Sequence, residues 1–401
     1  MNYPKLLAIF LFFGMTFLSY SQKSKTKQEK KSDTKSIKTN IKGIPFIVSD
    51  ANISTELNEI GVGYFRNKYI FLSNKKRRII EASKDAPIKE PNNYMYVLNI
   101  AENGDLSFPL LFSHKLVSEN NQGAVGFSPD FKVIYYTKEN AKDSQTYTLH
   151  KANFDEKNPD RWINLKDLKI VPAEYSVETP FVSPDGKKIY ISSNIPGGHG
   201  GFDLYEAPIL EDGTIGKLVN LGPQINTASD EKYPFVAADN QYMYFSSKGH
   251  DSYGGYDVFR SSIKNEIFSS VINVGPSLNS KNDEIAFAMD SDNKGYITSN
   301  NKIKDNYDLL KFEIKKQKNN QQTYSVVKED SKTALANVVV VIKNEFGKMV
   351  AVLKTDNKGT IKFNLKPLEK YTVAINTSGY EEYFAEISLD DEKKHFHLKK
   401  K

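Results

Sequence analysis

The sequence predicts an all-β chain, a five-bladed β-propeller followed by a small antiparallel β-sandwich. Three observations support this fold class. The 401 residues include 23 Tyr and 24 Phe against one Trp, and such aromatic residues favour the pleated, half-buried surface of a sheet. One strand-rich pattern recurs along most of the chain. A second run of short alternating segments, broken by turn residues, follows it and is typical of a small sandwich.

The repeat is clearest in three units that start at Glu178, Glu231 and Glu284, 53 residues apart in both steps. Each unit contains an apolar segment, a turn such as Pro-Asp-Gly, an aromatic segment that ends in Ser or Thr, a loop and a third segment. Two less regular copies start at Glu59 and Gly123. Short antiparallel strands repeated at a fixed period predict the blades of a propeller.

Each predicted blade needs a fourth, outer strand. Two segments between the units supply one, residues 217–226 and 270–279, which are again 53 residues apart. The last unit lacks such a segment because its third strand, residues 307–314, runs into the next domain. Residues 43–50 precede the first unit, and we expect them to close the ring as the fourth strand of the last blade. Closure removes a sheet edge that would otherwise invite aggregation.

The loop "PGGHGGFD" between the second and third strands of the third unit is rich in glycine, and a related loop ends in "GGYD" one unit later. Phosphate-binding loops run from a strand into a helix N-terminus, whereas both flanks here are predicted strands. Asp203 and Asp257 hold equivalent positions after these glycines. We interpret them as carboxylates that bind backbone amides in each blade.

The start of the chain predicts export. Residues 1–21 contain an apolar run, Leu6 to Leu18, followed by the small residues Ser19 and Ser21, the pattern of a cleavable signal peptide. The run is shorter than the roughly 20 residues that span a bilayer, and no lipid-anchoring cysteine follows, because the chain has no Cys. We therefore expect the protein in the periplasm, either free or peripheral to the outer membrane.

Positive charge is concentrated in residues 22–42, a low-complexity tether with 8 Lys and 2 acidic residues that accounts for the formal net charge of +6. The folded part is close to neutral, which disfavours binding to nucleic acid. The absence of cysteine excludes disulfides and thiolate metal sites. We interpret the tether as a solvated spacer, with attraction to an acidic envelope surface as the alternative.

The segment "SPDGKKIYISSN" followed by "GGFDLY" resembles the WD40-like repeats of TolB-type propellers, in the variant found in OmpA-family (PorE-like) envelope proteins of Bacteroidota. The resemblance covers roughly residues 44–314 and is most specific in the third and fourth units. It implies an envelope setting and a role in an assembly, such as an outer-membrane or type 9 secretion assembly. On this basis the propeller is assigned to residues 43–314.

After a polar linker, residues 315–322, the segments "LANVVVVIKN", "TDNKGTIKFNL" and "SGYEEY" resemble the carboxypeptidase-regulatory-like (transthyretin-type) module, assigned to residues 323–398. The name of this module implies no peptidase activity, and the chain has no His-Glu-x-x-His zinc motif. Larger relatives usually continue into an OmpA-like peptidoglycan-binding domain. None is visible here, so we expect no peptidoglycan association through this chain.

Four glutamates, Glu59, Glu178, Glu231 and Glu284, stand at the start of the innermost strand of a unit. A glycosidase needs two carboxylates in environments that push their pKa values apart, whereas these glutamates repeat with the fold. We interpret them as a quasi-symmetric structural ring. The alternatives are a polar ring that meets a partner or cation at one mouth of the central channel, and catalysis.

Other candidate chemistry is sparse. Of the six histidines, His395 and His397 share one face of a predicted strand, but no third metal ligand stands near them in the sequence. The sequence therefore predicts no enzyme, no cofactor and no metal site. The preferred function is a non-enzymatic interaction or scaffold protein of the periplasm or cell envelope. The alternative is a carbohydrate-binding or glycoside-hydrolysing propeller.

Envelope proteins are the expected partners, bound through the faces of the propeller. The first unit carries an insertion, residues 74–93, with a basic cluster that is a candidate docking site for an acidic protein or, alternatively, a solvated edge. The candidate partner-binding residues are Lys75, Lys76, Arg77, Arg78, Glu178, Glu231 and Glu284.

Overall fold

The computed structural model describes residues 43–75, 93–117, 120–141, 145–158, 161–290, 293–303, 306–315, 320–389, 391–392 and 394–401. Within these ranges every regular element is a β-strand, which confirms the predicted all-β class. The predicted signal peptide and tether, residues 1–42, lie outside the described residues, and so do Lys76, Arg77 and Arg78. Among the described residues no helix is long and apolar enough to cross a membrane.

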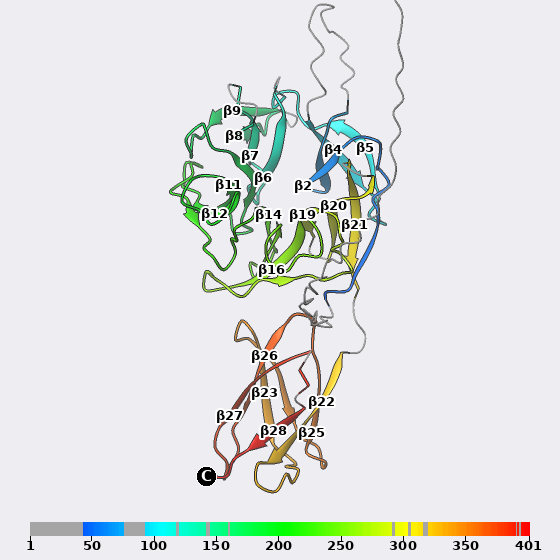
Figure 1. The fold of residues 1–401 in the computed structure, drawn as a ribbon, viewed down its shortest axis with the longest axis vertical. Coiled ribbons are helices and arrows are strands. Elements are labelled where there is room, and N and C mark those ends of the chain that lie inside the picture. Colours follow the sequence, from blue (N-terminus) through cyan, green and yellow to red (C-terminus); the bar gives the residue numbers. More distant parts are fainter. Residues whose placement is uncertain are drawn as a thin grey trace, which may run out of the picture. The chain divides into compact units, whose positions relative to one another are not determined.

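Five sheets of the described residues follow one plan, in which the three inner strands pair in chain order from the innermost outwards (Figure 1). We call these sheets blades 1 to 5. Blade 1 contains β2 (Glu59–Phe65), β3 (Lys68–Ser73), β4 (Tyr94–Ile100) and β5 (Leu106–Leu111). Blade 2 contains β6 (Gln122–Phe127), β7 (Val133–Glu139), β8 (Tyr147–Phe154) and β9 (Trp162–Asp167). Blade 3 contains β10 (Val177–Val182), β11 (Lys188–Ser193), β12 (Asp203–Pro208) and the short β13 (Val219–Asn220).

Blade 4 contains β14 (Glu231–Val236), β15 (Tyr242–Ser247) and β16 (Asp257–Lys264), and two short strands, β17 (Ile267–Phe268) and β18 (Ile272–Asn273), both pair with β16. Blade 5 contains β19 (Glu284–Met289), β20 (Lys294–Ile303) and β21 (Asn306–Ile314). The inner strands β2, β6, β14 and β19 surround the middle of the propeller in Figure 1. The segments expected to supply outer strands thus contain β13 and β18.

The expected closing strand is present. β1 (Phe46–Asp50) runs antiparallel to β21, with Phe46 opposite Ile314 and Asp50 opposite Leu310. Phe46 is buried against Phe312, with ring centroids 5.3 Å apart. The segment that precedes the closing strand passes so close to blade 4 that a Cβ on Gly43 would lie 2.5 Å from the Val274 carbonyl oxygen. The first strand of the propeller is therefore the outer strand of its last blade.

The propeller core lies between neighbouring blades. The side chains of Ile70 and Met95 from blade 1, for example, pack against those of Val125 and Ile134 from blade 2. Each middle strand is covered on both faces by the adjacent blades, and β3, β11 and β15 are buried along almost their whole length. This explains why these strands are continuous apolar runs instead of alternating ones.

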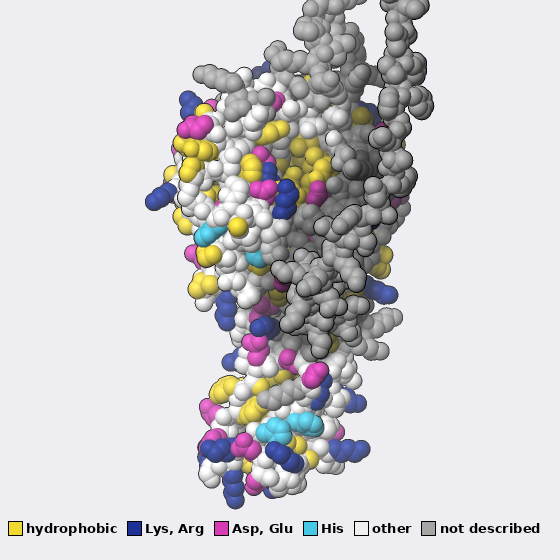
Figure 2. All heavy atoms as spheres, viewed as in Figure 1, with side chains coloured by type: hydrophobic (Ala, Val, Ile, Leu, Met, Phe, Trp, Pro, Cys, Tyr) yellow, Lys and Arg dark blue, Asp and Glu magenta, His cyan; other side chains and the backbone are white. Residues whose placement is uncertain are grey.

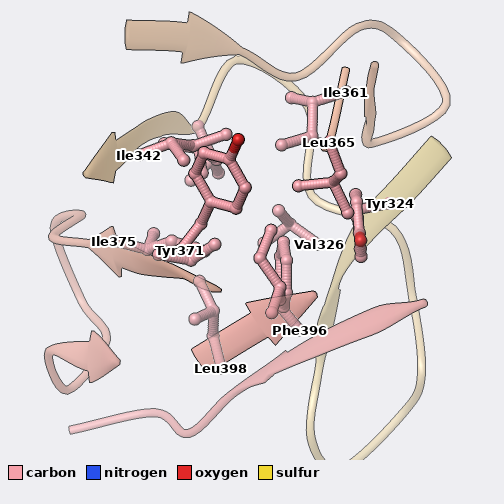
Figure 3. Close-up of a cluster of buried hydrophobic side chains, with 13 residues drawn as sticks. Tyr324, Val326, Ile342, Ile361, Leu365, Tyr371, Ile375, Phe396 and Leu398 are labelled. Atoms are coloured by element: carbon pink, nitrogen blue, oxygen red, sulfur yellow. The ribbon is translucent and has the colours of Figure 1, made fainter. Parts of the chain in front are cut away.

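The C-terminal domain has two sheets. One contains β22 (Gln321–Lys328), β25 (Thr360–Asn364) and β28 (His395–Leu398), and the other contains β23 (Val339–Asn344), β24 (Met349–Lys354), β26 (Lys370–Ile375) and β27 (Tyr383–Ser388). Their buried side chains meet in one core, where the rings of Tyr324 and Phe396 stack 5.2 Å apart (Figure 3). β28 pairs with β22 in parallel, within sheets that are otherwise antiparallel.

Candidate functional site at the channel mouth

Three of the four predicted glutamates are buried parts of the fold. Glu59, Glu231 and Glu284 are 3%, 0% and 1% exposed. The Glu231 carboxylate accepts hydrogen bonds from the amide and hydroxyl of Thr227, at 2.8 and 2.7 Å, and from the Ser247 hydroxyl at 2.6 Å. Glu284 is held in the same way by Ser280 and Ser299, and Glu59 by Thr55. These carboxylates hold the turns that lead into β2, β14 and β19.

Glu178 does not belong to this set, and the interpretation of four equivalent glutamates is wrong at this position. Val177 is opposite Ser193 in blade 3, just as Glu231 is opposite Ser247 and Glu284 opposite Ser299. Glu178 therefore stands one residue further along its strand. The residues at its position in the other blades are Ile60, Gly123, Lys232 and Ile285.

Glu178 forms an ion pair with the lysine that takes its place in the next blade. Its carboxylate lies 2.7 Å from the Lys232 ammonium and accepts a hydrogen bond from the Ser176 hydroxyl at 3.0 Å. The two charged side chains are 23% and 16% exposed, so the pair is partly buried but reachable from solvent. The Lys232 ammonium also lies 3.5 Å from the centre of the Phe202 ring, a cation–π contact.

Aromatic residues surround this pair because of the way the blades are linked. At the start of each inner strand a side-chain oxygen accepts a hydrogen bond from a backbone amide of the preceding blade. Aromatic residues donate four of these five amides among the described residues. The donor and acceptor pairs are Asn93 with Asn121, Tyr147 with Ser176, Phe202 with Asp230, Tyr256 with Asp283, and Tyr307 with Asn58.

The acidic acceptors bind more than one group. The Asp283 carboxylate accepts the hydroxyl of Tyr307 at 2.7 Å, and that of Asp230 lies 3.3 Å from both the Tyr256 hydroxyl and the Lys248 ammonium. Burial alone would raise the pKa of Asp230, but the Phe202 amide and Lys248 outweigh it and hold this pKa below its ordinary value. Asp230 therefore stays ionised at neutral pH.

The glycines of the loops make these contacts possible. A Cβ on Gly201 would lie 2.4 Å from Asp230 Oδ1, and one on Gly255 would lie 2.0 Å from Asp283 Oδ1. Asp203, the carboxylate after the first loop, accepts the backbone amides of His199 and Gly200. The structural interpretation of the glycine-rich loops is confirmed, because the carboxylate binds its own loop and the glycines admit the next blade.

A cavity of about 130 Å³ lies beside Glu178, among residues near the start of the inner strands of blades 1 to 4, and we call this end of the propeller its channel mouth. Tyr233 lines it, and its other polar lining comes from Asn93, Gln122, Thr137, Tyr147, Glu178 and Thr179. Among the lining residues that the structure describes, Glu178 carries the one formal charge. Figure 2 shows acidic and basic side chains near the middle of the propeller, next to a group of hydrophobic ones.

The inner strands are irregular where they line this cavity. Each carries a β-bulge, and Thr179, Tyr233 and Ala286 occupy the bulge with φ of 48°, 55° and 55°. Residues of the bulge, Tyr233 among them, also line a second cavity of about 200 Å³, which is walled mainly by Phe, Pro and Ala. Bulges and positive φ in residues other than glycine are frequent near functional sites.

The remaining candidates do not line this cavity or lie outside the described residues. Lys75 is described, and its carbonyl accepts the Tyr96 hydroxyl at 2.9 Å, but the rest of the basic cluster lies outside the described residues. The rings of His395 and His397 are 6.2 Å apart. No group of three or more potential metal ligands was found in the described part of the chain.

Sequence reasoning missed Lys232, Phe202 and Tyr147. A signal for Lys232 is present, because it is a lysine at a strand position where blades 1 and 5 carry Ile60 and Ile285. The constant 53-residue spacing concealed it, because that spacing aligns Glu178 with Glu231. The register shows that Val177 is the true equivalent of Glu231.

Comparisons with known proteins give similarities to solved structures alone. No family model matches the chain, and no curated protein matches it either. TolB from Acinetobacter baumannii is similar in structure, with 12% identity, a TM-score of 0.34 and coverage of 65% of this chain and 55% of that one. The endo-arabinase of Bacteroides thetaiotaomicron has 12% identity, a TM-score of 0.43 and coverage of 68% and 98%. At such identities the likeness concerns the fold alone.

One prediction needs correction. The sequence predicts that the chain is not an enzyme, and the comparison contradicts this, because the similar structures include that endo-arabinase and a GH32 beta-fructofuranosidase of Bombyx mori. The latter has 8% identity, a TM-score of 0.41 and coverage of 85% of both chains. The prediction rested on the equivalence of the four glutamates, and the register of Glu178 removes that support.

Proposed function

We propose that this chain is an exported protein of the cell envelope that binds a partner at the mouth of its central channel. The Glu178–Lys232 pair carries this proposal, because it breaks the repeat of the blades at a partly exposed position. Aromatic residues are enriched in the cores of protein interfaces and among interaction hot spots, and Phe202 and Tyr147 lie beside this pair. A purely structural ring would need no such exception.

The envelope setting rests on the signal-peptide pattern of residues 1–21 and on the resemblance to PorE-like propellers. An outer-membrane or type 9 secretion assembly is the kind of partner that the resemblance implies. The assignment of the C-terminal sandwich to the carboxypeptidase-regulatory-like module belongs to the same proposal. The basic cluster that starts at Lys75 would add a contact for an acidic partner.

The test is affinity purification from envelope extracts of the native host, with a tag on the C-terminus of the full chain. We expect a partner that the wild type retains and that Glu178→Gln loses. Glu206→Gln is the matched control, because Glu206 forms a comparable pair with Lys188, at 3.0 Å and 23% and 26% exposed, on β12 and β11. Retention of the same partner by Glu178→Gln would contradict the site. A wild-type chain that purifies alone at low salt would contradict the function.

A second candidate function is carbohydrate binding or glycoside hydrolysis at the same mouth. The Glu178 carboxylate beside the hydroxyls of Thr179 and Tyr147 favours it, because such groups can bind sugar hydroxyls. A glycan array and a panel of chromogenic glycosides separate the candidates. Turnover that Glu178→Gln abolishes and Glu206→Gln leaves intact would establish hydrolysis.

A further inference from the structure

The cavity beside Glu178 combines three properties. Its described lining has a single formal charge, which is negative, and the aromatic side chains of Tyr147 and Tyr233 contribute to its wall. Its volume of about 130 Å³ is below the roughly 300–1,000 Å³ of sites for drug-sized ligands. A small group, such as the end of one side chain, matches this volume.

Aromatic faces near the mouth already bind ammonium groups of the chain itself. The Lys232 ammonium lies 3.5 Å from the centre of the Phe202 ring, and the Lys248 ammonium lies 4.5 Å from the centre of the Tyr256 ring. A ring face attracts a cation through its quadrupole. Glu178 adds a carboxylate at the cavity wall, so the lining favours a positive charge.

Lys232 occupies only part of the binding capacity of Glu178. Its ammonium contacts one carboxylate oxygen, Oε2, and the other oxygen, Oε1, accepts the Ser176 hydroxyl. Lys232 does not itself line the cavity, whereas Glu178 does. A second cation that enters the cavity can therefore reach Glu178 and compete with Lys232, which would keep its contact with the Phe202 ring.

We propose that this cavity takes the ammonium or guanidinium group of a lysine or arginine side chain of a partner polypeptide, which replaces Lys232 on the Glu178 carboxylate. This inference rests on the proposed function and names the chemistry of the partner. It assigns opposite roles to the two members of the pair. Glu178 attracts the incoming cation, and Lys232 competes with it.

Because the two residues have opposite roles, substituting them should change the affinity for a cation in opposite directions. Purified full-length chain is titrated with n-butylammonium and with n-butylguanidinium, and binding is followed by NMR chemical-shift changes or calorimetry. We expect Glu178→Gln to weaken binding at least tenfold. We expect Lys232→Ile to strengthen it at least threefold, because the competing cation is gone. Ile is the residue that blades 1 and 5 carry at this position, in Ile60 and Ile285, so the variant suits the fold.

Matched controls separate the charge from general effects. Glu206→Gln and Lys188→Ile alter a similar pair outside the cavity and should change binding less than twofold. n-Butanol, which has the same chain without charge, should bind at least tenfold more weakly than the cations. Thermal melts of each variant show whether it is folded, and the substitutions Glu178→Ala and Lys232→Gln, which also remove the charge, replace any variant that is not.

Two patterns of binding would overturn the inference, as would the absence of cation binding. One is equal binding of butanol and the cations, which would make the cavity merely apolar. The other is weaker binding in both Glu178→Gln and Lys232→Ile, which would make the intact pair the recognition element. If an envelope partner is lost with Glu178→Gln while neither cation binds, the proposed function stands and the cation site is wrong. If the cations bind as expected but no partner is captured, the site stands and the proposed envelope partner is wrong.

Discussion

Glu231 and Glu178 are separated by one repeat of the sequence, yet they stand in opposite situations. Glu231 is wholly buried and accepts three hydrogen bonds from its own blade. Glu178 is partly exposed and pairs with a lysine of the next blade. The difference comes from a shift of one residue relative to the strand register. In a repeat protein, therefore, the position that breaks the repeat is the one to examine for function.

The largest expected effect is on Glu231. Glu231→Ala leaves the Thr227 amide and hydroxyl and the Ser247 hydroxyl without their buried partner. Each unsatisfied group costs roughly 1–3 kcal/mol, so we expect the free energy of unfolding to fall by about 4 kcal/mol. Urea denaturation measures it. Glu178→Ala in the same assay should lose about 1 kcal/mol or less, as an exposed pair does; equal losses would remove the contrast between the two glutamates.

The next effect concerns the glycine loop that leads to the Glu231 turn. A Cβ on Gly200 would lie 2.0 Å from the Ser229 carbonyl oxygen and 2.6 Å from that of Thr227. Because these are backbone atoms, relief requires the turn to move, and we expect Gly200→Ala to cost about 2–3 kcal/mol. Gly197, in the same loop, has open space but a φ of 91°, so Gly197→Ala should cost only about 1 kcal/mol. Thermal melts of both variants test this order.

The sequence predicts much of this fold because its signals are local and repeated. Related turn residues stand between the first two strands of several units, as in "SPDF", "SPDG" and "AADN", and the lack of an outer strand in the last unit was enough to identify β1 as its partner. The site was less predictable. Periodicity cannot reveal that blade 3 is offset by one residue, because that offset appears only in the pairing of Val177 with Ser193. The pairing of Glu178 with Lys232 requires two blades to be placed side by side.

Lowering the pH distinguishes two kinds of buried group, because folding shifts their pKa values in opposite directions. Burial raises the pKa of Glu59 and Glu284, and hydrogen bonds from Thr55 and Ser280 only partly offset it. The folded state therefore holds these protons more tightly than the unfolded state, and the two glutamates do not destabilise the fold as pH falls. The pKa of His150 is lowered to about 4, first by burial and then by Lys138.

His150 should therefore set the acid limit between pH 6.5 and pH 4. Below pH 6.5, the approximate pKa of an unfolded-state histidine, the unfolded chain binds a proton at His150 that the folded chain does not bind. The free energy of unfolding therefore decreases as pH falls through this window. We expect the decrease in unfolding free energy over this window to be smaller in His150→Phe, by about 2 kcal/mol or somewhat more, since one pKa unit corresponds to about 1.4 kcal/mol. Urea titrations at pH 7 and pH 4.5 measure it, and an unchanged pH dependence would contradict the assignment.

The smallest expected effect is on the pair itself. Partly exposed ion pairs contribute about 0–1 kcal/mol, and an apolar replacement of a buried one is often neutral. Lys232→Ile should therefore change the free energy of unfolding by less than about 1 kcal/mol, and the coupling energy from a double-mutant cycle with Glu178→Gln should be equally small. Urea denaturation of the four proteins measures both. A coupling above about 2 kcal/mol would mean that the pair is retained for stability, whereas a small one leaves binding as the reason why blades 3 and 4 depart from their neighbours.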